Sequence, residues 1–122
     1  MPEAKAKDFP DLIVWQKAHA LVLKVYALTR HFPDEERFGL VTQMRRAAVS
    51  IAANIAEGFK RRGSKNKLMF YNMSQTSLEE VRYYLILVHD LGYARNLEEL
   101  TEAGKEVARL LQGLMNAVRK YS

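Results

Sequence analysis

Apolar residues recur every three or four positions in four separate blocks of the chain. The first block contains Trp15, Ala18, Val22, Val25, Thr29 and Phe32, and the second contains Val41, Met44, Ala48, Ile51 and Ile55. The third contains Tyr71, Ser74, Leu78, Val81, Leu85 and Val88, and the fourth contains Leu97, Leu100, Gly104, Val107, Leu111, Leu114, Val118 and Tyr121. This spacing is typical of amphipathic helices that bury one face. The alternation of a β-strand is not sustained over more than a few residues, so the pattern predicts an all-α protein.

Helix-stopping residues separate the four blocks. Pro33 follows the first block, Gly63 the second and Gly92 the third, and these residue types end helices or restart the chain. We predict helices over about residues 11–32, 35–62, 65–91 and 97–120, preceded by a loose N-terminal arm at 1–10. Because the connections are short, consecutive helices should be antiparallel neighbours. The expected architecture is an antiparallel up-down-up-down four-helix bundle that forms a single domain over residues 1–122.

Length and composition agree with one domain. A chain of 122 residues buries roughly two-thirds of the surface that its unfolded form exposes, which is enough for a core without cross-links. The chain contains no cysteine, so disulfides and thiolate metal sites are excluded. The longest apolar runs fall far short of the roughly 20 residues of a membrane span, and the first residues lack the apolar stretch of a signal peptide. We expect a cytoplasmic protein that does not enter a membrane.

Positive charge is concentrated in one quarter of the chain. The protein has a net charge of +5, yet residues 37–67 contain eight basic residues and a single acidic one, Glu57. This segment carries +7 and the remainder carries −2. Such an asymmetry favours a polyanionic partner through electrostatic steering, although charge alone identifies no ligand.

Five of these basic residues surround the predicted turn between the second and third helices. With Arg45, which lies further up the second helix, they form the predicted nucleic-acid-binding set: Arg45, Lys60, Arg61, Arg62, Lys65 and Lys67. Phe59, Phe70 and Tyr71 lie close to the turn, and single-stranded nucleic-acid binders combine cations for phosphates with aromatic rings for bases. The alternative is a solvated corner, because the rings could cap the bundle core and basic residues are favoured at any helix C-terminus.

A polar stripe runs along the second predicted helix. Its members are Arg46, Ser50, Asn54 and Glu57, separated by steps of four, four and three, which places them on one face. Alanine and isoleucine flank Asn54, and small residues let another helix approach closely. We interpret the stripe as either a solvated face or a partly buried, hydrogen-bonded seam between helices or subunits.

The sequence carries no complete motif for catalysis, a metal or a cofactor. Residues 58–65 come close to the phosphate-binding loop G-x-x-x-x-G-K-[ST], but the last two residues are reversed and the segment follows a helix instead of a strand. The Glu-x-x-His pairs of di-iron bundles are absent. Ser50 and Ser77 lack the glycine pattern of a nucleophile elbow. We therefore expect no enzyme activity, no metal and no cofactor.

Several segments, in the right order, resemble a known bacterial family. They are "VWQKAHAL" with Tyr26, Thr29 and Phe32-Pro33, then Gly39-Leu40, "QMRRAAVSIAANIAEG", Ser77-Leu78-Glu79 and Leu91-Gly92-Tyr93. Over about residues 11–93 the chain resembles the four-helix-bundle proteins encoded by intervening sequences of 23S ribosomal RNA genes. A related branch is the accessory variability protein of diversity-generating retroelements, a basic pentamer that partners a reverse transcriptase and nucleic acid.

The resemblance implies an antiparallel bundle that assembles as a homopentamer, and it implies no established activity. Its motif marks five positions without an agreed role, namely Arg45, Arg46, Asn54, Glu57 and Gly58. Our first hypothesis is a non-enzymatic homo-oligomeric bundle that presents its basic corner to RNA or another polyanion. The alternative is a protein–protein assembly or adaptor module whose charge serves solubility and orientation. The remaining hypothesis is an enzyme with an intersubunit site built from Arg46, Asn54 and Glu57.

Overall fold

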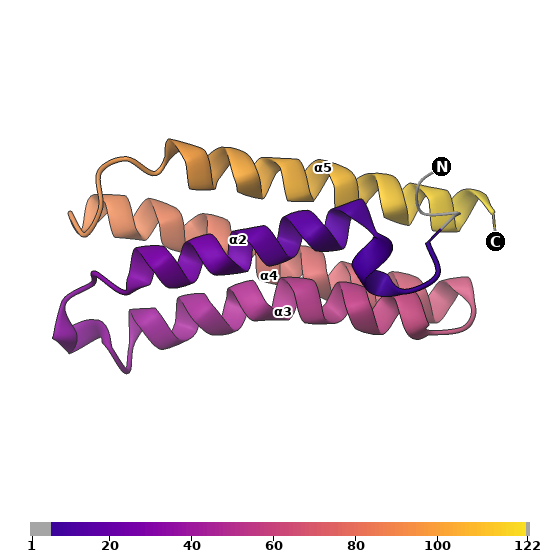
Figure 1. The fold of residues 1–122 in the computed structure, drawn as a ribbon, viewed down its shortest axis with the longest axis horizontal. Helices are drawn as coiled ribbons and strands as arrows, with labels where there is room; N and C mark the ends of the chain where they lie inside the picture. Colours follow the sequence, from indigo (N-terminus) through magenta and orange to yellow (C-terminus); the bar gives the residue numbers. More distant parts are fainter. Residues whose placement is uncertain (1–5, 122) are drawn as a thin grey trace.

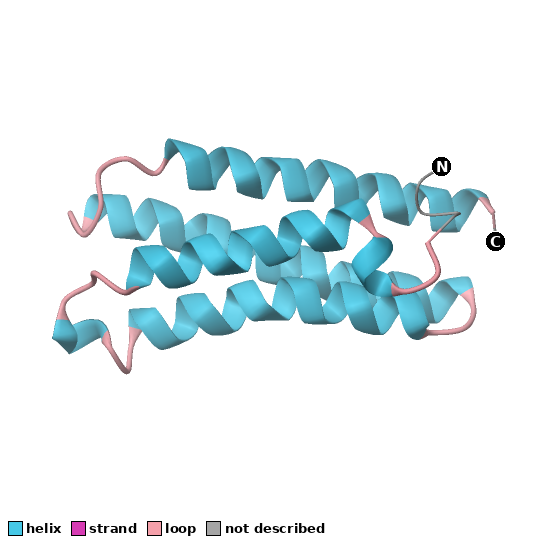
Figure 2. Cartoon of the chain, in the orientation of Figure 1, coloured by secondary structure: helices cyan, strands magenta, loops and turns pink. Residues whose placement is uncertain are grey.

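Four long helices make up most of the protein. The computed structural model describes residues 6–121. They form α2 (Ile13–Thr29), α3 (Leu40–Lys60), α4 (Ser64–Asp90) and α5 (Glu98–Lys120), with short 3-10 helices η1 (Phe9–Asp11) and η2 (Asp34–Glu36) (Figure 1, Figure 2). No strand occurs in this part of the chain. The predicted all-α class is confirmed.

The helices run alternately up and down and close into a bundle. α2 packs on α3 and α5, and α4 packs on the same two helices, so the order around the bundle is α2, α3, α4, α5. The most extensive contact joins α3 and α4. Figure 1 shows the α3–α4 turn, the start of α2 and the end of α5 at one end of the molecule. The four-helix bundle predicted from the apolar spacing is confirmed.

The apolar stripes of the helices meet in one core. Met44, Ile51 and Ile55 of α3 are fully buried, as are Val81 and Val88 of α4. Every buried side-chain nitrogen or oxygen among the described residues has a hydrogen-bond partner. Among the described residues, the core therefore carries no cost from polar side-chain atoms left unpaired away from water.

The chain between α2 and α3 differs from the prediction. α2 ends at Thr29 instead of near 32, and α3 begins at Leu40 instead of near 35. Between them lies η2, and the Leu40 N–H donates to Glu36 Oε1 at 3.3 Å. Gly39 precedes α3 with a non-helical backbone (φ −114°, ψ −105°). The acidic segment after Pro33 therefore caps α3 and does not form its first turn.

Part of the N-terminal segment is ordered, contrary to the loose arm expected at 1–10. The Phe9 N–H donates to Asp8 Oδ1 at 2.8 Å, and the Asp8 N–H donates to Asp11 Oδ2 at 3.1 Å. This reciprocal capping satisfies donors that a short helix leaves free. η1 contacts α2 and α3, and the Phe9 ring packs edge-on against Trp15 with 5.1 Å between centroids. Residues 1–5 of the expected arm lie outside the described residues.

The α4–α5 connection is tied to η2 at the opposite end from the α3–α4 turn. Tyr93 follows Gly92, which has a φ of +76°, and its hydroxyl donates to Glu36 Oε2 at 2.7 Å. The Tyr93 ring also lies 5.4 Å from that of Phe32. The hydrogen bond to the Glu36 carboxylate, helped by partial desolvation and by nearby acidic charge, raises the pKa of Tyr93 to about 12. Two connections distant in sequence are thus held together.

Candidate nucleic-acid interface

The predicted basic corner is the turn between α3 and α4. α3 ends at Lys60 and α4 begins at Ser64, and Gly63 between them has a φ of +77°, a backbone conformation that favours glycine. No side chain caps the start of α4, so the N–H groups of its first turn add positive potential there. The five basic residues predicted at this corner therefore lie on or beside one tight turn.

Lys67 is committed to the end of α3. Its Nζ donates to Phe59 O at 2.7 Å and to Gly58 O at 3.3 Å, two carbonyls of the last turn, where helices run out of intrahelical donors. The same Nζ lies 5.4 Å from the centroid of the Phe59 ring. Partial burial lowers the pKa of Lys67. Lys67 thus serves as a C-terminal cap for α3.

Arg61 also has internal partners. Its guanidinium lies 3.0 Å from Glu57 Oε2 in an i,i+4 ion pair and 4.5 Å from the centroid of the Phe70 ring. An exposed ion pair of this kind stabilises a helix by about 0.3–0.5 kcal/mol. The ion pair matters more for the charge and position of Arg61. Glu57 partly neutralises Arg61, whose guanidinium lies over the Phe70 ring.

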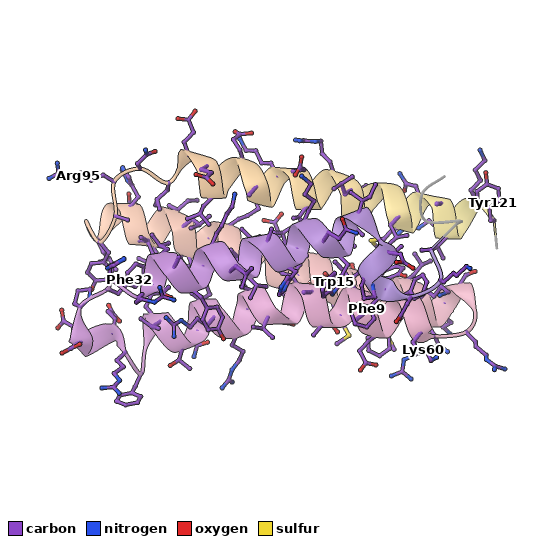
Figure 3. All side chains as sticks on the ribbon, in the orientation of Figure 1. Phe9, Trp15, Phe32, Lys60, Arg95 and Tyr121 are labelled. Carbon is purple, nitrogen blue, oxygen red and sulfur yellow. The ribbon has the colours of Figure 1, made fainter. Side chains whose placement is uncertain are left out.

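The remaining corner residues, Lys60, Arg62 and Lys65, have no side-chain partner in the described part of the chain. All three are exposed, and none has a side-chain hydrogen bond or ion pair within residues 6–121. Figure 3 shows Lys60 at the end of α3, with its side chain directed away from the bundle. These three side chains are available to a ligand without loss of an existing bond.

The fold brings further basic residues to the same end, which the sequence analysis did not group with the corner. Figure 3 shows Tyr121, at the end of α5, on the same end of the bundle as Lys60. We define the basic end as the set Lys7, Lys60, Arg61, Arg62, Lys65, Lys67, Arg119 and Lys120, against which stand the acids Asp8, Asp11 and Glu57. The predicted topology could have shown that the end of the fourth helix joins this corner. In an antiparallel four-helix bundle, the fourth helix ends beside the turn between the second and third helices.

Arg45 lies apart from the basic end. Its Nε donates to Thr29 Oγ1 at 2.9 Å, its guanidinium donates to Tyr26 O at 3.4 Å, and it lies 4.5 Å from the centroid of the Tyr26 ring. Along α3, Arg45 and Lys60 are roughly 22 Å apart at about 1.5 Å per residue. Arg45 fastens α3 to the end of α2, and the structure does not bring it together with the other predicted residues.

Two members of the polar stripe, Ser50 and Asn54, are half-buried, and Ser50 contacts α4. Asn54 Nδ2 donates to Ser50 O and Ser50 Oγ, both at 2.9 Å, and Ser77 Oγ of α4 donates to Ser50 Oγ at 2.8 Å. Nearby, the fully buried Ser74 donates to Ile51 O at 2.7 Å. Within the stripe, Ser50 therefore joins two helices of one chain. Sequence reasoning placed Ser74 and Ser77 on α4 without this role, although a serine within an apolar stripe was a signal for it.

The other two members of the stripe face outward. Arg46 and Glu57 are exposed. Glu57 pairs with Arg61, whereas Arg46 has no side-chain partner in the part of the chain that the structure describes. The structure separates an inner pair, Ser50 and Asn54, from this outer pair, and a contact of the outer pair with another subunit stays a prediction.

The surface hollows are shallow and carry no cluster suited to metal chemistry. One of about 600 Å³ lies at the basic end, between Phe9 of η1 and Lys60 of α3. Another of about 570 Å³ lies between α4 and the start of α5, beside Ile86. Over residues 6–121, no three His, Cys, Asp or Glu residues converge to hold a metal ion. Within that same range, none of the helices combines the length and apolar character needed to cross a membrane.

Comparison with known proteins places the chain among helical-bundle proteins. The profile of the family described as 23S rRNA-intervening sequence protein matches residues 10–113. A solved structure of a protein of unknown function from the S23 ribosomal protein family of Bacteroides thetaiotaomicron is similar, with a TM-score of 0.76 and 20% sequence identity. The similarity covers 84% of this chain and 98% of that one, and at this identity it shows the fold alone. No curated protein matches the chain.

Proposed function

Because the chain belongs to the family of 23S rRNA-intervening sequence proteins, we propose that it is a non-enzymatic helical bundle that binds RNA or another polyanion through its basic end. The observation that carries the proposal is the concentration of eight basic side chains at one end of the bundle, opposed by three acidic ones, counted over residues 6–121.

The cations of the corner that have no partner in the described part of the chain determine how strongly binding should depend on salt. Lys60, Arg62 and Lys65 have no internal partner among the described residues, so contacts with phosphates replace only water and counterions. Each neutralised phosphate of a duplex contributes about −0.9 to the slope of log K against log salt. Three such contacts per subunit predict a slope of about −3, which assembly into an oligomer would steepen.

A titration of labelled RNA, followed by fluorescence anisotropy at low and at moderate salt, tests the proposal. The test variant carries Lys60→Glu, Arg62→Glu and Lys65→Glu. The control carries Arg30→Glu, Arg95→Glu and Arg109→Glu, which change the net charge equally at exposed positions outside the basic end. Figure 3 shows Arg95 at the opposite end from Lys60.

We expect the test variant to lose binding by more than about tenfold, because each reversed cation removes a phosphate contact and adds a repulsion. The control should retain most of its affinity. Absence of binding by the wild-type protein at low salt would refute the proposal, as would equal losses in the two variants.

We propose in addition that the protein is a homo-oligomer, and the family resemblance implies a pentamer. Exposed apolar residues on the outward face of α4 support this, since Met69, Met73 and Tyr83 are 52%, 45% and 57% exposed and another subunit could cover them. Light scattering coupled to size exclusion should give a multiple of 14.0 kDa. A Met73→Glu, Tyr83→Glu variant should shift to lower mass, whereas a monomeric wild-type protein would contradict the assembly.

The same apolar face of α4 favours the adaptor function as the second candidate. A protein partner would dock there, and the basic end would then serve orientation and solubility. Capture of one specific protein after nuclease treatment, lost in the Met73→Glu, Tyr83→Glu variant, would support the adaptor over the RNA binder. The relation to the accessory protein of diversity-generating retroelements also stays a proposal, and a gene position beside a reverse transcriptase would support it.

A further inference from the structure

We infer that the basic end recognises the sugar–phosphate backbone of double-helical RNA and does not stack the bases of a single strand. The inference rests on the proposed function and specifies its ligand. Proteins that bind single strands combine a cationic groove with aromatic rings whose faces are open to successive bases. Whether the aromatic rings of the basic end have faces open to bases decides between a duplex and a single strand as the ligand.

The ring of Phe70 already has a cation over it. The Arg61 guanidinium lies 4.5 Å from its centroid and is anchored by the ion pair with Glu57 at 3.0 Å. The side chain is also half-buried. A base could reach this ring only after Arg61 had moved and its contacts had been lost.

Phe59 and Tyr71 are also poorly placed for stacking, although Phe59 is half-buried and lines the hollow at the basic end. Lys67 Nζ lies 5.4 Å from the centroid of Phe59 and is fixed by its hydrogen bonds to two α3 carbonyls. Phe59 itself packs against the core. Tyr71 is only 1% exposed. Of the three rings that the sequence offered for stacking, Tyr71 is buried, and Phe59 and Phe70 are half-buried with a cation beside each.

Tyr121 is more open than the other rings at this end, because it is 75% exposed, whereas Phe9 is half-buried and packs against Trp15. Lys120 Nζ lies 5.5 Å from its centroid. A single ring can stack a single base, whereas binding along a strand requires several platforms in sequence. Tyr121 therefore does not make the basic end a reader of single strands, and it supplies a useful variant for the test.

The groups that remain open at the basic end suit phosphates. Lys60, Arg62 and Lys65 are exposed cations without internal partners among the described residues. A duplex presents phosphates from two strands, one charge per about 1.7 Å of axis in the B form. Double-stranded RNA is recognised mainly through phosphates, 2′-hydroxyls and helical shape. Where base stacking is not available, the higher phosphate charge density of a duplex therefore favours it over a single strand.

The test compares a fluorescently labelled RNA duplex with each of its separated strands, at about 50 mM and about 200 mM KCl. Wild-type protein should bind the duplex at least about tenfold more tightly than either strand. Arg62→Ala should weaken duplex binding and reduce the salt slope by about 1. Arg109→Ala, the matched exposed arginine on α5, should change neither quantity.

Two ring variants distinguish backbone binding from stacking. Phe70→Leu and Tyr121→Leu should leave RNA binding within about twofold of wild type, since a stacked base would contribute about fivefold or more. Tyr121 is exposed, so its variant tests stacking even if Phe70→Leu alters folding. Equal affinity for strands and duplex, or a loss of strand binding in Tyr121→Leu, would overturn the inference while leaving the proposed function intact. Failure of both RNAs to bind at low salt would end both.

Discussion

At the scale of single residues, Gly58 leaves the space that a buried tyrosine fills. A Cβ at this position would lie 2.5 Å from Tyr71 Cε1 and 3.1 Å from Phe70 Cβ. The family motif marks Gly58 without giving it a role. The packing supplies one, since the missing side chain lets the first turns of α4 lie against the end of α3.

Gly58→Ala should lower the free energy of unfolding by about 1–3 kcal/mol, the usual cost of overpacking a core. Alanine's higher helix propensity, worth about 1 kcal/mol, offsets only part of that cost. Gly113→Ala in α5 is the matched control, because nothing lies within 4 Å of its Cβ, and it should stabilise by up to about 1 kcal/mol. Urea unfolding measures both, and shifts in the same direction would argue against a steric role for Gly58.

Two tyrosines make stability sensitive to alkaline pH. Burial raises the pKa of Tyr71 to about 12, and the hydrogen bond to Glu36 is the main cause that raises the pKa of Tyr93 to about 12. The folded state therefore keeps protons that the unfolded chain releases near pH 10. The stability that these groups supply is complete below about pH 10 and is lost as pH rises towards 12. The lowered pKa of Lys67 acts in the opposite direction.

We expect the free energy of unfolding to fall between about pH 10 and 12, and to fall less steeply in Tyr93→Phe, because that variant has no hydroxyl to ionise. Tyr121→Phe is the control, since its ring is 75% exposed, and it should follow the wild-type profile. Urea unfolding across this range measures the slopes. A Tyr93→Phe profile as steep as that of wild type would show that ionisation of Tyr93 does not cause the fall in stability.

At the scale of elements, the apolar spacing predicted the existence and order of the four helices but not every boundary. A period of three to four residues needs several turns to become visible, so η1, with three residues, gave no such signal. The start of α3 depends on the Glu36 side chain reaching the Leu40 N–H. Contacts of this kind depend on where a loop places a side chain, and hydrophobic patterning does not encode that.

The serine contacts between α3 and α4 should contribute to stability. Ser74→Ala removes the buried hydrogen bond to Ile51 O and should cost about 1 kcal/mol in the free energy of unfolding. Thr76→Ala is the control, because its hydroxyl donates to Asn72 O within α4 at an exposed site, and it should change stability by less than about 0.5 kcal/mol. Chemical unfolding compares them. Equal costs would mean that the α3–α4 contact gains nothing from Ser74.

At the scale of the whole molecule, the charge of the α3–α4 turn was visible in the sequence, but its continuation was not. Lys7 lies on the same hollow as Lys60, and Lys120 ends α5, whose last turn the antiparallel topology places at the same end as the turn. The different roles of the basic residues at the turn could not be predicted from the sequence either. The capping role of Lys67, for example, depends on the positions of two α3 carbonyls. Nucleic-acid binding by these residues stays a prediction.

Gathering like charges at one end should make stability depend on salt. Mutual repulsion of the basic end is screened within about 8–10 Å at physiological ionic strength, so the thermal midpoint should rise as salt is added to a low-salt buffer. An Arg62→Gln, Lys65→Gln variant should be more stable at low salt and respond less. Lys105→Gln, at an exposed lysine paired with Glu102, should respond as wild type does. A midpoint that does not change with salt would contradict the repulsion.

The packing of η1 on α2 also gives the protein a reporter of its own. Trp15 is the single tryptophan of the chain, and it lies between Phe9 and His19, whose ring stacks on it at 5.1 Å with 7° between planes. Its emission therefore depends on whether η1 is docked. Phe9 of this cluster also lines the hollow at the basic end. Binding events there should be measurable by intrinsic fluorescence, without a label on protein or ligand.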